Sequence, residues 1–69
     1  MVEVFKTNIK DKVNAAEVVK DLKGFLPAAK VNFDLHDCDN ILRIEGQYIP
    51  IPKVRELLQN MGFYCEVLE

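Results

Sequence analysis

Apolar and polar residues alternate along two neighbouring segments in the middle of the chain. In residues 30–36 the apolar positions are Val31, Phe33 and Leu35, with Asn32, Asp34 and His36 between them. Residues 41–45 repeat the alternation, with Leu42 and Ile44 as the inner positions. A period of two predicts strands that bury one face. The intervening residues 37–40 are rich in Asp and Asn, which is typical of a turn, so the two strands are expected to form a hairpin.

Two other segments carry apolar residues at helical spacing. The first has them at i, i+3, i+4, i+7 and i+11, namely at Ala15, Val18, Val19, Leu22 and Leu26. Asn14 followed by Glu17 predicts a capping box at its start, and Gly24 and then Pro27 predict its end. The second helix is expected to begin near Pro52 and to end at Gly62 in a left-handed conformation. Its apolar positions are Val54, Leu57, Leu58 and Met61.

The ends of the chain, residues 2–6 and 63–68, have the β-branched and aromatic composition of strands. The element order βαββαβ predicts an α+β, ferredoxin-like sandwich: a four-stranded antiparallel sheet in the order 4-1-3-2 with two helices on one face. Residues 1–69 form a single domain, since a chain of this length supports one core. The predicted core residues are Val4, Ile9, Val18, Leu22, Val31, Phe33, Leu35, Leu42, Ile44, Val54, Leu57, Met61, Phe63 and Val67.

Charge and composition narrow the classes of partner. The net charge is −2 and the nine Lys and Arg residues are spread along the chain, so we expect no nucleic-acid binding. No apolar run approaches the roughly 20 residues that span a bilayer, and the N-terminal residues do not resemble a secretory signal. Two cysteines are too few for a disulfide scaffold. These features predict a cytoplasmic protein with reduced thiols and no membrane association.

The hairpin and the second helix together resemble a known family. The segments VNFDLHDCDNILRIEG and KVRELLQNMGF are similar to the second half of a heavy-metal-associated domain, the copper-chaperone-like module of metal trafficking. The resemblance covers nearly the whole chain and implies Cu(I) binding by a Met-x-Cys-x-x-Cys motif in the first loop. This sequence has Ile9 in place of that Met, and Asp11 and Asn14 where the cysteines fall. Because both thiolates are missing, copper binding in the family's manner is not carried over.

A metal site with rearranged ligands is the alternative that the turn suggests. The topology brings the first loop and the turn to one end of the sheet, where the candidate ligands are Asp11, His36, Asp37, Cys38 and Asp39. This mixture suits a transition metal ion such as Zn(II) better than Cu(I). The same residues also suit a turn without metal, with His36 in solvent on an edge strand. The sequence therefore predicts no cofactor and names these five residues only as candidates.

The chain lacks the residue combinations of common catalytic sites. His36 is the single histidine, the acidic residues are scattered, and no glycine-rich phosphate loop is present. We expect a non-enzymatic interaction or regulatory protein, with a metal-binding or metal-chaperone role as the alternative. Cys65 alternates with Phe63 and Val67, which predicts a core position.

The surfaces expected to bind a protein partner or a second copy are the edge strands and the helix-free face of the sheet. On that face we place Phe5 and Tyr64. Simple partial burial of both rings is the other interpretation.

Overall fold

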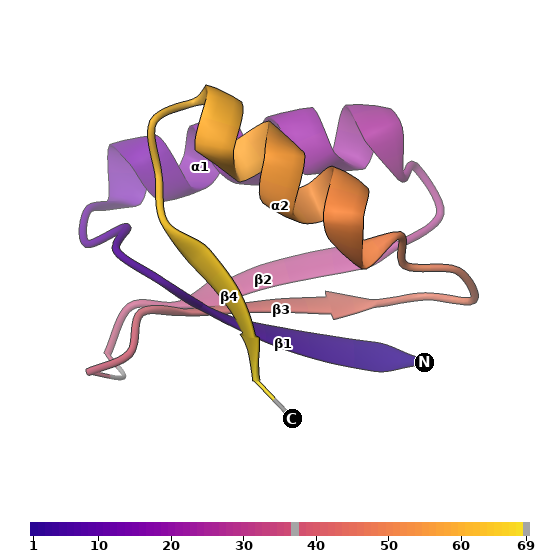
Figure 1. Cartoon of the computed structure of the whole chain (residues 1–69), viewed down its shortest axis with the longest axis horizontal. Helices are drawn as coiled ribbons and strands as arrows, with labels where there is room; N and C mark the ends of the chain where they lie inside the picture. The colour runs from indigo at the N-terminus through magenta and orange to yellow at the C-terminus, as the bar shows by residue number, and fades with distance from the viewer. Residues whose placement is uncertain (37, 69) are drawn as a thin grey trace.

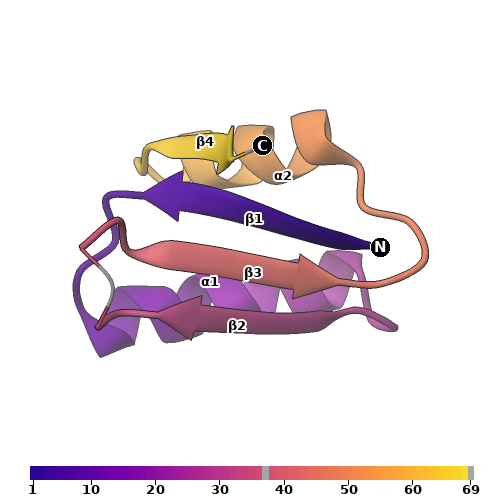
Figure 2. The same ribbon diagram turned by 90° about the horizontal axis from the view of Figure 1, so that it is seen from below.

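The computed structural model describes residues 1–36 and 38–68, which form a sheet covered on one face by helices (Figure 1). The elements are β1 (Val2–Thr7), α1 (Lys12–Phe25), β2 (Lys30–Asp34), β3 (Ile41–Glu45), α2 (Ile51–Asn60) and β4 (Cys65–Leu68). The four strands pair antiparallel in the order β2-β3-β1-β4, which is the expected 4-1-3-2 order counted from the opposite edge. Figure 2 shows both helices behind the sheet. The predicted α+β, ferredoxin-like arrangement is confirmed.

The register of β1 decides which of its side chains enter the core. Phe5 lies opposite Leu42 of β3 and Val67 of β4, and residues directly opposite share a face of the sheet. Phe5 is accordingly fully buried under the helices. Val4 points to the helix-free face and is only half-buried. The prediction that Val4 is a core residue and that Phe5 lies on the helix-free face is therefore wrong.

The core lies between the sheet and the two helices. Its buried apolar residues are Phe5, Ile9, Ala15, Val18, Leu22, Val31, Leu42, Ile44, Ile49, Val54, Leu58 and Cys65. Six predicted core residues pack against this cluster in partly buried positions: Phe33, Leu35, Leu57, Met61, Phe63 and Val67. The prediction for Cys65 is confirmed. Thr7 is a polar residue inside the core, at 3% exposure, and its position was not predicted.

Helix α1 begins one turn earlier than the sequence indicated. Its N-cap is Asp11, whose carboxylate accepts hydrogen bonds from the Asn14 amide at 3.0 Å and from the Asn14 side chain at 2.8 Å. Asp and Asn are about equally good N-caps, so the chemistry of Asn14 alone does not place the start of the helix. The predicted capping box of Asn14 and Glu17 is wrong, because Asp11 caps the helix and Asn14 lies within its first turn.

Helix α2 follows the prediction more closely. Pro52 lies in its first turn, where a missing backbone amide is tolerated. Gly62 follows the C-cap residue Met61 and has φ +91°, as predicted for a left-handed residue after a helix. Neither helix of the described chain has the length and apolar character needed to cross a bilayer.

Candidate functional site

The turn between β2 and β3 packs directly against the end of β1. The Thr7 amide donates to the Asp39 carbonyl at 3.2 Å, and the Thr7 hydroxyl donates to the Asn40 carbonyl at 2.6 Å. The Lys6 ammonium lies 3.6 Å from the Asp39 carboxylate. The turn and the end of β1 thus meet at one end of the sheet, as the topology predicted.

Two of the candidate metal ligands at this end have other side-chain partners. Asp11 caps α1, and Asp39 pairs with Lys6. His36 and Cys38 are exposed, and the His36 amide donates to the Asp34 carboxylate at 3.1 Å in a turn. Asp37 lies outside the described residues. Within residues 1–36 and 38–68, no three His, Cys, Asp or Glu side chains form a group that could hold a metal ion.

The capping bond has an electrostatic consequence at Asp11. The hydrogen bond from the Asn14 amide favours the charged carboxylate and holds the pKa of Asp11 below its ordinary value of 3.8. Because the pKa is depressed in the folded chain, the cap adds stability above the unfolded pKa. That stability is lost as the pH falls through the folded pKa.

We expect Asp11→Asn to remove part of the acid-induced loss of stability below about pH 4, since Asn still caps the helix but carries no charge. Urea unfolding followed by circular dichroism over a series of pH values measures this effect. Asp21→Asn, on the same helix but away from the cap, is the control. At neutral pH, Asp11→Ala should destabilise more than Asn14→Ala. The reverse order would restore Asn14 as the cap.

The two described cysteines have contrasting environments. Both are free: Cys38 is exposed in the turn, and Cys65 is buried at the start of β4. Burial raises the pKa of the Cys65 thiol to about 11, so it stays protonated at neutral pH. A protonated thiol is a poor nucleophile and a poor metal ligand. Cys65 therefore acts as a small apolar core residue.

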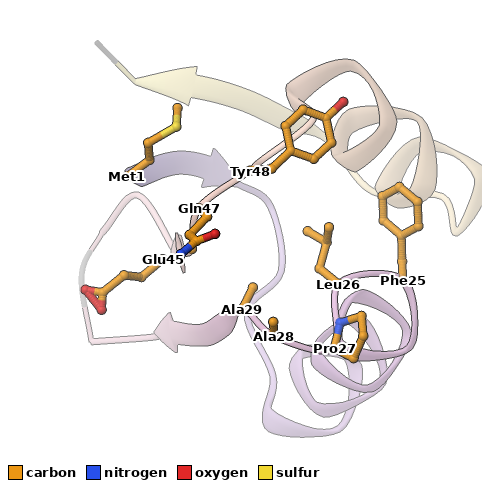
Figure 3. A pocket seen from close by; sticks show the side chains of 10 residues that line it. Met1, Phe25, Leu26, Pro27, Ala28, Ala29, Glu45, Gln47 and Tyr48 are labelled. Carbon is orange, nitrogen blue, oxygen red and sulfur yellow. The ribbon is translucent and has the colours of Figure 1, made fainter.

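A hollow lies at the opposite end of the sheet, where α1 ends and where the β3–α2 loop begins (Figure 3). Its volume is about 580 Å³. It is lined mainly by apolar groups, from Met1, Phe25, Leu26, Pro27, Ala28, Ala29, Glu45, Gly46, Gln47 and Tyr48. The aromatic side chains of Phe25 and Tyr48 remain 43% and 73% exposed. We refer to this feature as the Phe25–Tyr48 hollow.

Backbone hydrogen bonds fix the walls of the Phe25–Tyr48 hollow. The Leu26 amide donates to the Leu22 carbonyl at 2.6 Å, and the Ala29 amide donates to the Leu26 carbonyl at 3.0 Å, so residues 26–29 form a tight connection. A Cβ at Gly46 would lie 3.3 Å from the Cβ of Ala29. Glycine at this position therefore allows the end of β3 to approach the start of β2 closely.

Phe25 and Tyr48 were not among the candidate site residues predicted from the sequence. Phe25 lies three residues after Leu22 at the end of α1, yet it is partly exposed and does not belong to the buried core. Tyr48 lies in the short loop between Gly46 and α2. Phe25 also lines a smaller hollow of about 180 Å³ with Lys53, Glu56, Leu57 and Asn60.

The helix-free face of the sheet is of mixed character. Tyr64 is half-exposed there, and its hydroxyl donates to Glu66 at 2.5 Å, which raises the pKa of Tyr64. The strand register places charged residues on the same face, at Lys6, Lys30, Asp34, Arg43, Glu45 and Glu66. Because Phe5 is in the core, the predicted patch of Phe5 and Tyr64 does not form.

Comparisons with protein-family models, with curated proteins and with solved structures found no match for this chain. The observed class is a small, compact α+β domain of ferredoxin-like topology. The resemblance to heavy-metal-associated domains stays a prediction.

Proposed function

We propose that this chain is a non-catalytic interaction domain that binds another protein through the Phe25–Tyr48 hollow. The observation that carries this proposal is the pair of exposed aromatic side chains beside a largely apolar hollow of about 580 Å³. Aromatic residues around a pocket commonly supply much of the binding energy at protein interfaces. Phe25 and Tyr48 leave ring surface exposed directly beside an apolar hollow, and exposed apolar surface gathered in one place favours an external partner.

The lining of the hollow indicates what the partner contributes. Leu26, Pro27 and Ala29 offer aliphatic surface, while Glu45 and Gln47 place polar groups at the same site. An apolar side chain of the partner fits the hollow, and backbone groups around it can bond to the Gln47 side chain. Such an arrangement has the apolar centre and polar rim of ordinary interfaces.

Metal binding by rearranged ligands, the alternative from the sequence, has less support. Asp11 is occupied by the helix cap and Asp39 by Lys6. The interaction proposal requires neither residue. The free cysteines support a reducing compartment, and on that basis we propose the cytoplasm.

Replacing Phe25 or Tyr48 by Ser should weaken binding to the partner about tenfold or more, because each substitution removes an aromatic contact. Affinity purification from native cells, quantified by mass spectrometry, identifies proteins captured by the unchanged chain. Titration calorimetry with the purified partner then gives the dissociation constant of each variant. The matched control is Val13→Ser, which removes an apolar side chain of 72% exposure at the other end of α1.

Circular dichroism of Phe25→Ser and Tyr48→Ser should match that of the unchanged chain, since neither side chain belongs to the buried core. Equal affinities for the two variants and the unchanged chain would contradict the proposal. It would also be contradicted if the unchanged chain retained no protein beyond those retained by a variant carrying both Phe25→Ser and Tyr48→Ser.

A further inference from the structure

We infer that two copies of this chain form a symmetric dimer by antiparallel pairing of their β2 strands, which joins two sheets into one. This inference goes beyond the proposed function, since it concerns a different surface. β2 is an edge of the sheet and pairs with β3 on its inner side (Figure 2). The backbone amides and carbonyls along such an edge can pair with another strand.

The sequence of β2 is complementary to itself in the antiparallel direction. A two-fold axis through Asn32 places Lys30 opposite Asp34 of the second copy and Val31 opposite Phe33 of the second copy. By symmetry each pairing occurs twice. Opposite charges directly across an antiparallel pair are stabilising, and so are pairs of aromatic and β-branched residues.

The exposure of these residues agrees with the pairing. Lys30, Asn32 and Asp34 lie on the helix-free face and are exposed. Lys30 also lies opposite Glu45 of β3, so pairing places it between two carboxylates, Glu45 and Asp34 of the second copy. On the helix-covered face Phe33 is only partly buried, and a neighbouring strand covers more of its ring.

The other edge of the sheet lacks this complementarity. β4 has four residues, and antiparallel pairing centred on Glu66 would bring two carboxylates together. Centring on Val67 would place Glu66 opposite Leu68 of the second copy. Neither arrangement matches opposite charges, so the observations favour β2.

Analytical ultracentrifugation of the whole chain tests the dimer. The unchanged chain should dimerise with increasing concentration up to about 1 mM, and high salt should weaken the association. Lys30→Asp and Asp34→Lys, each alone, should weaken dimerisation about tenfold or more. Each substitution turns both charge pairs between the two β2 strands into like-charge pairs. Lys53→Asp, an exposed change on α2, should leave the dimer unaltered.

A mixture of the two single variants provides the sharpest outcome. The lysines of one variant meet the carboxylates of the other, so an equimolar mixture should form a one-to-one dimer at concentrations where each variant alone is largely monomeric. This recovery controls for local damage, such as loss of the bond between Asp34 and the His36 amide. A monomeric unchanged chain, a mixture that stays monomeric, or single variants that dimerise normally would each overturn the inference. Phe25→Ser and Tyr48→Ser should still dimerise, which separates this result from the test of the proposed function.

Discussion

Phe5→Ala should remove most of the stability of the fold. Phe5 is fully buried on the central strand β1, between Leu42 and Val67. Truncating a buried Phe to Ala leaves a cavity and costs about 3–5 kcal/mol. At about 0.05–0.15 kcal/mol per residue, a domain of this size has a total of only about 3–10 kcal/mol. Urea unfolding monitored by circular dichroism measures the loss, and we expect a variant that is largely unfolded or close to it.

Val4→Ala on the same strand is the matched control. Val4 is half-buried on the helix-free face, so its truncation should cost about 1 kcal/mol or less. The two variants test the register of β1 directly, because the interpretation from the sequence alone exchanged the roles of these residues. A greater loss for Val4→Ala than for Phe5→Ala would contradict the observed register.

Thr7→Val should have the second largest effect, with a loss of about 2–3 kcal/mol. The Thr7 hydroxyl donates to the Asn40 carbonyl at 2.6 Å and accepts from the Ile9 amide at 3.2 Å. Valine keeps the shape of the side chain but leaves both backbone groups without this partner in a largely buried place. Thermal unfolding gives the loss of stability, and amide hydrogen exchange at residues 38–40 reports loosening of the turn.

Thr7→Ser separates the hydroxyl from the methyl group. Serine retains both hydrogen bonds and loses one methyl group, at a cost of about 1 kcal/mol. If Thr7→Val proved as stable as Thr7→Ser, the hydroxyl would not hold the turn against β1.

The elements whose residues alternate clearly were predictable from sequence. Val31 and Phe33 in β2, and Leu42 and Ile44 in β3, each mark one inner face, and the hairpin pairs these two strands. The order of the whole sheet followed from the βαββαβ sequence of elements. β1 was ambiguous because Val2, Val4 and Phe5 are all apolar, so the period of two does not select a face. The observed face follows from pairing with β3 and β4, which a local pattern does not contain.

The same limit applies to the helix cap and to the candidate sites. Asp11 and Asn14 are both good N-caps, and only the path of the chain from β1 to α1 selects Asp11. The bond between Thr7 and Asn40 joins residues 33 positions apart. The Phe25–Tyr48 hollow likewise depends on three segments meeting: Met1, residues 25–29 from the end of α1 and the connection after it, and residues 45–48 from the end of β3 and the β3–α2 loop.

Heavy-metal-associated domains, which the sequence resembles, bind metal at the end of the sheet that corresponds to the β1–α1 loop and the β2–β3 turn. In this chain Thr7, Asp11 and Asp39, which lie at that end, make contacts that stabilise the fold, while His36 and Cys38 are exposed there. The exposed aromatic residues of the hollow lie at the opposite end. The proposed binding site therefore lies at the opposite end of the sheet from Asp11 and the β2–β3 turn.

Site-specific photo-crosslinking in native cells tests the central claim, that this domain binds a protein through the Phe25–Tyr48 hollow. A benzophenone amino acid replaces Tyr48 in one experiment and Val13, at the other end of α1, in the control. The account predicts a discrete crosslinked protein from position 48 that is lost on adding Phe25→Ser, and none from position 13. Equal crosslinking from both positions, or a product at position 48 that persists with Phe25→Ser, would contradict it.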